Sequence, residues 1–332
     1  MCKCGCEPES KSARWGRGRT ATLFIASVVL MALFMSALQA QAQDITVVSY
    51  DLGEITITQG WFPPESRFFN MPVRLRGVLA VPPGEGPFPV AFFVHGSYVF
   101  CTAPLVNEAD VYPCPEEHDL RQFEGFTYLA EALAARGYLA MVPDTSAEHT
   151  VGFGEPVFGE RGIQIIEAHL NALAGGEGFG LDLAGKADMA RLMMVSHSRG
   201  GPLSIIYTID ERATHPVFAL ALLTPAAPPE GVIIPDDMPT ALVIAQCDGD
   251  ILTREPMVYA DEQLSPLRPT LTAFFTIPRG THNAFSTQLL PDFFPNPDCE
   301  GLDLLEPELQ RAFTVRFVPD FLDMALGQVT FP

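Results

Sequence analysis

The feature that most constrains this chain is a short apolar run that ends abruptly in a serine turn. Residues 191–201 read RLMMVSHSRGG, and Leu192–Val195 has the uninterrupted apolar character of a strand buried on both faces. The next residues, Ser196–Gly200, have the pattern small-x-Ser-x-small, one substitution away from the G-x-S-x-G nucleophile elbow. A plain Ser/Gly-rich turn is the alternative. The pattern predicts a sharp strand-to-helix turn that holds the hydroxyl of Ser198 clear of the backbone.

Two later strands end in the residue types that activate a serine. The apolar run Ala241–Ala245 leads into two aspartates, and the run Leu271–Ile277 leads into His282. In a Ser-His-Asp triad, the histidine takes the proton of the serine and the aspartate holds the imidazole in the correct tautomer. The order serine, aspartate, histidine, with each residue at a strand end, predicts such a triad. A loop histidine bonded to a backbone carbonyl is the alternative for His282.

The acid of this triad is either Asp248 or Asp250. Asp250 lies farther beyond the strand and is followed by Ile251–Leu252, an apolar pair that can anchor the loop. Asp248 precedes Gly249, and this pair is typical of a turn. We therefore predict Asp250 as the catalytic acid.

The oxyanion hole needs two backbone N–H groups near the serine. The N–H of Arg199 follows the nucleophile at the start of a helix, where the helix dipole also favours negative charge. The second donor is expected in the loop after the apolar strand Pro89–Val94, where Gly96 lets the backbone approach closely. We predict the N–H of Ser97 as this donor and Tyr98 as a wall of the substrate pocket.

Other candidate groups are assigned structural roles or excluded. His95 is expected to shape the oxyanion loop, and His197 to be a structural residue of the elbow. No group of His, Cys, Asp and Glu has convincing metal-ligand spacing, and no phosphate loop or dinucleotide fingerprint occurs. We therefore predict no metal and no cofactor.

Buried strands and helices alternate along most of the chain. The expected strands are Val73–Val81, Pro89–Val94, Tyr138–Val142, Leu192–Val195, Val217–Leu223, Ala241–Ala245 and Leu271–Ile277. The expected helices are Phe126–Ala135, Arg161–Leu173, Leu203–Ile209 and Leu309–Ala325, the last kinked or interrupted at Pro319. The alternating segment Asp44–Thr58 is expected to form edge strands. This order predicts an α/β fold: a mostly parallel sheet with helices on both faces, antiparallel N-terminal edge strands, and no large cap domain.

The N-terminus has the character of an export signal. Basic residues precede the apolar stretch Ala21–Leu38, and Ala40-Gln41-Ala42 is an A-x-A cleavage site. We predict a signal peptide over residues 1–42, a single domain over residues 43–332, and a secreted or periplasmic protein. A retained membrane anchor is the alternative.

The charge balance excludes some partners. The chain has 20 basic and 40 acidic residues, and residues 1–42 hold five and two of these, so the mature chain has 15 and 38. Such a surface repels nucleic-acid phosphates and anionic lipid heads. We predict a small-molecule or polymeric substrate, no nucleic acid, and membrane association only if the leader stays attached.

Four cysteines follow the leader: Cys101, Cys114, Cys247 and Cys299. An even number in an exported chain indicates two disulfides, with three possible connectivities. Pairing Cys101 with Cys114 would close a short loop, and pairing Cys247 with Cys299 would tie the predicted acid and base loops together. Free buried thiols are the alternative.

The motifs resemble those of the α/β-hydrolase superfamily over about residues 70–325. Ser196–Gly201 is similar to the GHSRGG elbow of chlorophyllases, with serine in place of the first glycine. His95-Gly96-Ser97 resembles the oxyanion strand of chlorophyllases, platelet-activating-factor acetylhydrolases and bacterial polyester hydrolases. Cys247 precedes the predicted acid as a disulfide cysteine does in some polyester hydrolases. The resemblance implies carboxylic-ester hydrolysis.

The residues and the resemblance together predict a serine hydrolase that cleaves a carboxylic ester through an acyl-enzyme. An amidase or peptidase would use the same triad. A non-catalytic binding protein on a hydrolase scaffold is a further alternative, although such a protein would not need the triad order.

Overall fold

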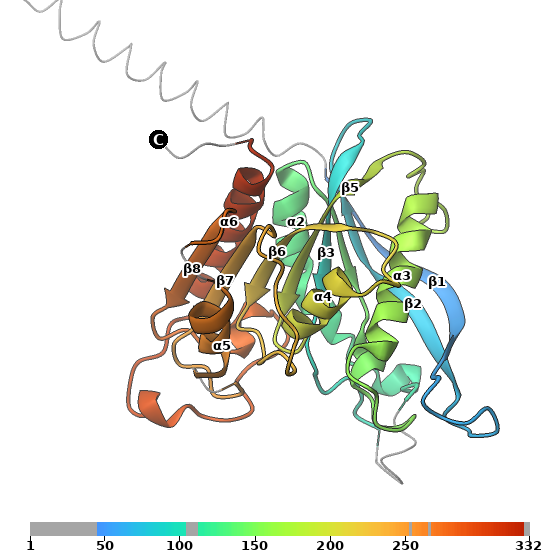
Figure 1. Ribbon diagram of the computed structural model, residues 1–332, viewed down its shortest axis with the longest axis horizontal. Coiled ribbons are helices and arrows are strands. Elements are labelled where there is room, and N and C mark those ends of the chain that lie inside the picture. The colour runs from blue at the N-terminus through green and yellow to red at the C-terminus, as the bar shows by residue number, and fades with distance from the viewer. Residues whose placement is uncertain (1–44, 104–111, 252–253, 265–266, 329–332) are drawn as a thin grey trace, which may run out of the picture. The chain divides into compact units, whose positions relative to one another are not determined.

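A single sheet orders the part of the chain that the structure describes. The structure is a computed structural model that describes residues 45–103, 112–251, 254–264 and 267–328. The strands are β1 (Thr46–Thr58), β2 (Asn70–Val81), β3 (Phe88–Val94), β4 (Leu139–Pro143), β5 (Ala187–His197), β6 (Val217–Leu223), β7 (Thr240–Ala245) and β8 (Thr272–Ile277). They form one sheet in the order β1-β2-β4-β3-β5-β6-β7-β8 (Figure 1).

The sheet is antiparallel at one edge and parallel elsewhere. β1 pairs antiparallel with β2, and β2 with β4. Every later pairing is parallel, from β4-β3 through β7-β8. Parallel strands place their carboxyl ends at one edge, which is where ligands bind in sheets of this kind. The predicted fold class is confirmed.

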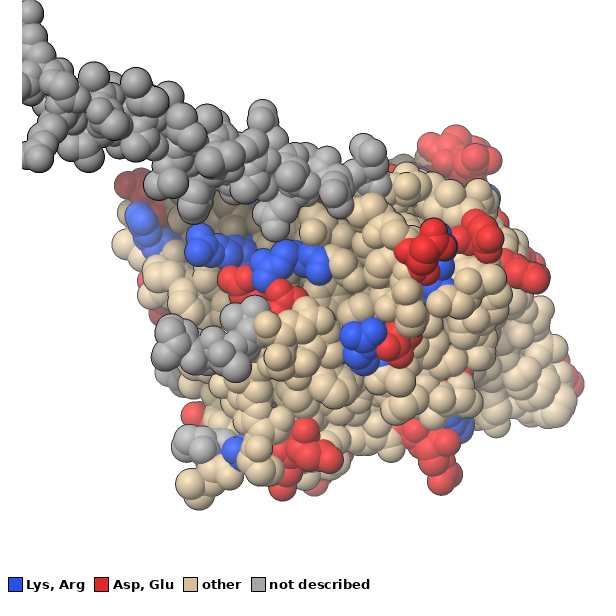
Figure 2. Space-filling model, turned by 90° about the horizontal axis from the view of Figure 1, so that it is seen from above, with Lys and Arg blue, Asp and Glu red and all other residues tan. Residues whose placement is uncertain are grey.

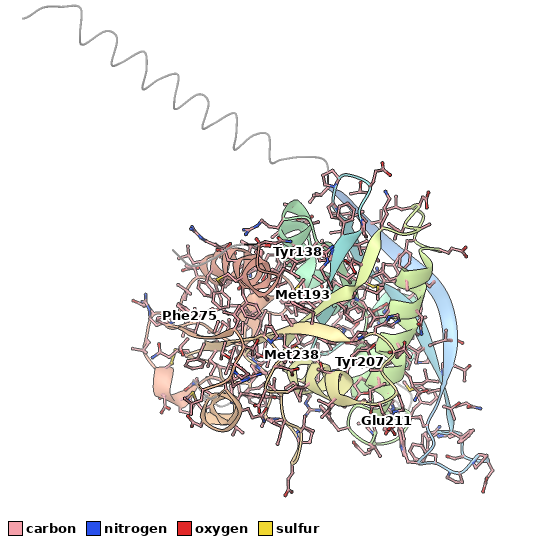
Figure 3. The ribbon with its side chains drawn as sticks, turned by 45° about the horizontal axis from the view of Figure 1, so that its top comes forward. Tyr138, Met193, Tyr207, Glu211, Met238 and Phe275 are labelled. Carbon is pink, nitrogen blue, oxygen red and sulfur yellow. A yellow bond between two sulfur atoms is a disulfide. The ribbon has the colours of Figure 1, made fainter. Side chains whose placement is uncertain are left out.

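Helices cover both faces of the sheet. They are α2 (Thr127–Ala135), α3 (Glu160–Gly175), α4 (Gly200–Ile209), the short α5 (Arg254–Val258) and α6 (Pro307–Ala325). Two separate apolar clusters show which helices cover which face: α2 and α6 contribute to one, and α3 and α4 to the other. Figure 3 labels Tyr138 and Met193 of the first cluster and Tyr207 and Met238 of the second.

The last helix is not interrupted at its internal proline, which leaves a kink as the remaining form of the prediction. α6 begins at Pro307 and continues through Pro319 without interruption. Val318, Phe321 and Leu322, on both sides of the proline, are fully buried in the core. Burial on both sides holds the two halves of the helix against the sheet and offsets the backbone hydrogen bond that proline cannot donate.

Both expected disulfides form. Cys101 is bonded to Cys114 and Cys247 to Cys299, with Cα–Cα distances of 5.6 and 5.7 Å. The second bridge joins the loop after β7 to the segment that follows the His282 loop. Of the three possible connectivities, the structure therefore has the one that pairs near neighbours and ties the two loops.

The predicted signal peptide, residues 1–42, lies outside the described residues. Asp44–Pro332 is one compact unit. Within the described ranges, no helix is long and apolar enough to cross a bilayer.

Candidate active site

Ser198 stands at the apex of the turn between β5 and α4. Its φ is +58°, in the left-handed region that side chains other than glycine rarely adopt. The turn needs small neighbours, because a Cβ on Gly96 would lie 2.5 Å from Cβ of Ser198, and a Cβ on Gly200 would lie 2.0 Å from the carbonyl oxygen of Val94. A strained residue held by such close packing is typical of a nucleophile elbow.

His282 is bonded to a buried aspartate, and that aspartate is Asp248. Nδ1 of His282 lies 2.7 Å from Oδ2 of Asp248, which has no exposed surface. The same oxygen accepts a hydrogen bond from the hydroxyl of Thr224, and Oδ1 accepts one from the N–H of Ile251 at 2.7 Å. With Nδ1–H donating to Asp248, Nε2 of His282 is left as the proton acceptor.

The prediction of Asp250 as the partner of His282 is wrong. Its Oδ2 accepts a hydrogen bond from the side-chain amide of Asn283 at 3.0 Å, and its Oδ1 from the N–H of Phe294 at 2.9 Å. The tight turn after β7 explains the difference. The N–H of Asp248 bonds back to Ala245, so the chain turns at once and directs the earlier aspartate toward the imidazole.

Asp292 holds the loop that carries His282, and no pattern in the sequence points to it. Its Oδ2 accepts a hydrogen bond from the N–H of His282 at 2.8 Å, and its Oδ1 accepts one from the N–H of Asn283 at 2.7 Å. Burial raises the pKa of Asp292, although these two N–H groups favour the charged form. Asp292 lies in a loop rich in proline and phenylalanine, where no periodic pattern marks any one position.

A chain of buried hydrogen bonds joins the elbow to two other loops. The hydroxyl of Tyr98 lies 2.6 Å from Nδ1 of His197, and Nε2 of His197 lies 2.9 Å from the carbonyl oxygen of His282. Burial holds the pKa of His197 well below its ordinary value, so the ring is neutral and carries its proton on Nε2. The hydroxyl of Tyr98 is then the donor to Nδ1. Tyr98 is 8% exposed and does not line the pocket, so the prediction of a substrate contact for it is wrong.

The oxyanion loop is oriented by His95. Its Nε2 accepts a hydrogen bond from the N–H of Thr145 at 2.8 Å, so its Nδ1 carries the proton and donates to the carbonyl of Gly96, also at 2.8 Å. The N–H of Ser97 belongs to the same planar trans peptide and points the opposite way from that carbonyl. Ser97 and Arg199, the two predicted donors, both line the pocket that contains Ser198.

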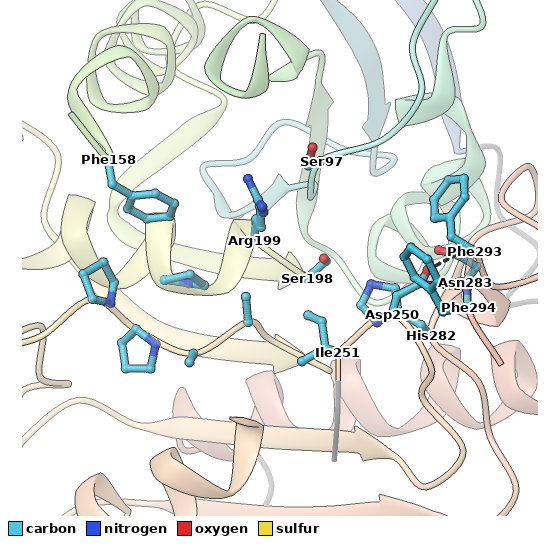
Figure 4. Close-up of a pocket in the computed structure, with 15 residues that line it drawn as sticks. Ser97, Phe158, Ser198, Arg199, Asp250, Ile251, His282, Asn283, Phe293 and Phe294 are labelled. Atoms are coloured by element: carbon cyan, nitrogen blue, oxygen red, sulfur yellow. Dashed lines mark hydrogen bonds between the residues drawn. The ribbon is translucent and has the colours of Figure 1, made fainter. Parts of the chain in front are cut away.

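These residues surround a cavity of about 690 Å³ (Figure 4). In Figure 4, Phe158 and Arg199 lie on one side of Ser198 in the cavity, and His282, Phe293 and Phe294 lie on the other side. Phe293 and Phe294 are 52% and 65% exposed, so aromatic side chains rim the opening. The other lining residues are Ser97, Pro202, Ala226, Ala227, Pro228, Pro229, Asp250, Ile251 and Asn283. Among the described residues, no group of three or more His, Cys, Asp or Glu side chains is placed to hold a metal ion.

The mostly parallel sheet with antiparallel first strands, covered by helices on both faces, is the predicted α/β-hydrolase fold. A sugar hydrolase of Lactococcus lactis is similar with a TM-score of 0.51 at 13% identity, over 83% of this chain and 99% of that one. Esterase 2 of Thermogutta terrifontis has a TM-score of 0.48 at 13% identity, over 78% and 92% of the two chains. A Rhizomucor miehei esterase has 0.48 at 14% identity, over 88% of each.

No protein-family model and no curated protein sequence matches the chain. At such low identity, the structural similarity shows the fold alone. The narrower resemblance to chlorophyllases, platelet-activating-factor acetylhydrolases and polyester hydrolases stays a prediction.

Proposed function

We propose that the protein is a serine hydrolase that cleaves carboxylic esters through an acyl-enzyme. The observation that carries the proposal is the convergence of a strained serine and a histidine on one cavity, with the histidine bonded to a fully buried aspartate. Each of the three comes from a different loop at the carboxyl edge of the sheet. A binding protein has no need of this arrangement, whereas nucleophilic catalysis depends on it.

The mechanism follows from these positions. Nε2 of His282 takes the proton of the Ser198 hydroxyl as its oxygen attacks the ester carbonyl. The carbonyl oxygen becomes an oxyanion, which the N–H groups of Ser97 and Arg199 stabilise. The C–O bond to the alcohol then breaks, and the imidazolium gives its proton to the leaving oxygen. Water, deprotonated by the same histidine, hydrolyses the acyl-serine and restores the enzyme.

Asp248 acts through the histidine. It fixes the tautomer with the proton on Nδ1 and stabilises the imidazolium as it forms. Three hydrogen-bond donors, from His282, Thr224 and Ile251, converge on its carboxylate and fix its position.

A panel of para-nitrophenyl esters of graded chain length, with matched para-nitroanilides, tests the activity. We expect hydrolysis of the esters and loss of about five orders of magnitude in kcat in Ser198→Ala. Ser196→Ala is the matched control, because Ser196 is buried outside the cavity and its hydroxyl has no hydrogen-bond partner in the described chain. Faster cleavage of the anilides would make the protein an amidase, and equal turnover by Ser198→Ala would refute the proposal.

We also propose export, with cleavage of the leader before Gln43. The two disulfides support it, because such bonds persist in oxidising compartments. N-terminal sequencing of the protein recovered outside the cytoplasm should begin near Gln43. An intact N-terminus in the membrane fraction would favour the anchor instead.

A further inference from the structure

An arginine without a protein partner lines the cavity beside the nucleophile. Among the described arginine side chains, only Arg199 and Arg316 make no hydrogen bond, ion pair or ring contact. The others bind carboxylates, amide or backbone carbonyls, or an aromatic ring. On the face shown in Figure 2, basic side chains lie beside acidic ones at several places. In a chain with 40 acidic residues, Arg199 is thus an exposed arginine that lines a pocket and remains free to bind a ligand.

Arg199 lies on the side of the cavity that would hold the acyl chain. In Figure 4 its side chain extends between Phe158 and Ser97, whereas His282 lies on the other side of Ser198. The histidine must give its proton to the leaving alcohol, so the alcohol lies on the His282 side. With the ester oxygen in the oxyanion hole, the acyl chain extends away from the histidine, and Figure 4 shows Arg199 and Phe158 on that side of Ser198.

We propose that the cavity selects esters whose acyl chain ends in a carboxylate, which pairs with the guanidinium of Arg199. The substrate class is the half-ester of a dicarboxylic acid. This inference rests on the proposed esterase function. The planar guanidinium can donate two parallel hydrogen bonds to a carboxylate. Phe158 and the prolines that line the cavity provide an apolar wall for the methylene chain between the ester and the carboxylate.

The acidic residues of the protein do not cancel this attraction. Asp250 is the carboxylate that lines the same cavity, and both of its oxygens already accept hydrogen bonds, from Asn283 and Phe294. In Figure 4 it lies on the His282 side. Repulsion from surface acids is screened beyond about 8 Å at physiological salt, whereas a direct contact with Arg199 is screened much less at that salt concentration.

Two matched substrates test the proposal: the mono-para-nitrophenyl ester of adipic acid, and the same compound with its free carboxylate capped as a methyl ester. The readout is the ratio of kcat/KM for the anionic ester to kcat/KM for the capped ester. We expect Arg199→Gln to lower this ratio about five- to ten-fold; solvent around the exposed guanidinium limits the effect. About 0.5 M sodium chloride should lower the ratio in the wild type and leave it unchanged in Arg199→Gln.

Arg316→Gln is the matched control, because Arg316 is an exposed arginine on α6 that also lacks a protein partner. It should keep the wild-type ratio. If Arg199→Gln keeps that ratio while both esters are hydrolysed, the carboxylate subsite is refuted and the esterase function stands. If the wild type hydrolyses neither these esters nor the graded panel, both proposals fail.

Discussion

At the scale of single residues, two aspartates separated by one glycine have different surroundings. Asp248 is fully buried and receives three hydrogen bonds, one of them from the imidazole of His282. Asp250 is only partly buried and accepts hydrogen bonds from Asn283 and Phe294. Only the first can hold the tautomer of the base.

We predict that Asp248→Asn lowers kcat by about ten-thousand-fold, because an amide at this position favours the wrong tautomer of His282. Asp250→Asn keeps the shape of its side chain and one acceptor oxygen, so its loss should be far smaller. Steady-state kinetics with a short ester decides between them. A larger loss of kcat in Asp250→Asn would show that Asp250 is the catalytic acid, as the sequence predicted.

A second prediction concerns Tyr98, which we infer to be a positioning residue. Tyr98→Phe leaves Nδ1 of His197 buried without a donor, which should cost about 1–3 kcal/mol of unfolding free energy. Because His197 also holds the carbonyl of His282, kcat should fall while KM changes little.

Tyr138→Phe is the control for this variant. Tyr138 is also buried and hydrogen-bonded through its hydroxyl, but its partner is Asp323 in α6. It should lose stability and keep kcat. Equal kcat in both variants would show that the bonds through His197 serve stability alone.

At the scale of elements, the loop before α3 is held in place by two buried ionisable side chains, Arg161 and Glu148. Arg161 donates to carbonyls of Thr150 and Phe153, and Glu148 accepts hydrogen bonds from the N–H groups of Gly159 and Gly162. The loop ends near Phe158, which lines the cavity.

Burial raises the pKa of Glu148 to about 7 and outweighs the two N–H groups and Arg161, which lower it. The folded protein thus keeps a proton that the unfolded chain loses near its ordinary value of 4.5. The retained proton therefore contributes to the free energy of unfolding, on the order of 3 kcal/mol. This contribution is fully present below pH 4.5 and is lost as the pH rises to about 7.

Chemical denaturation at several pH values tests this. The unfolding free energy of the wild type, minus that of Glu148→Gln, should decrease as the pH is raised from about 4.5 to 7. A difference that stays flat across this range would contradict the prediction.

The bridge between Cys247 and Cys299 should contribute to both stability and activity. It closes a separation of 52 residues, worth about 4 kcal/mol in the chain-entropy model. Cys247 directly precedes Asp248, so its loss also frees the acid. Replacing both cysteines by serine should lower the unfolding free energy and kcat together. Wild-type values for both, in protein whose mass shows the bridge is absent, would contradict this.

At the scale of the whole molecule, strand ends made most of the site predictable. Parallel strands share one carboxyl edge, so apolar runs ending in Ser198 and His282 implied that these residues meet. Both line the same cavity, as do the predicted donors Ser97 and Arg199. The sheet and the disulfide pairing were predictable for similar reasons, from periodicity and from sequence separation.

The residues of the site that were not predicted from the sequence lie in tight turns or in long loops. Asp248 and Asp250 differ by two residues in a turn whose direction is set by its hydrogen bond to Ala245. Tyr98 turns into the core and bonds to His197, and this contact was not predictable because the two residues are 99 positions apart in the chain. Asp292 and Phe158 come from loops without apolar periodicity, so their positions follow only from the assembled fold.

The central claim is that Ser198 is a nucleophile activated by His282 and Asp248. Inactivation by a para-nitrophenyl alkylphosphonate tests it most directly, because one nitrophenol is released for each serine that reacts. We predict release of about one equivalent per chain, an adduct that peptide mapping places on Ser198, and much slower labelling of Asp248→Asn than of Asp250→Asn. No adduct, an adduct on another residue, or equal labelling rates in the two aspartate variants would contradict the claim.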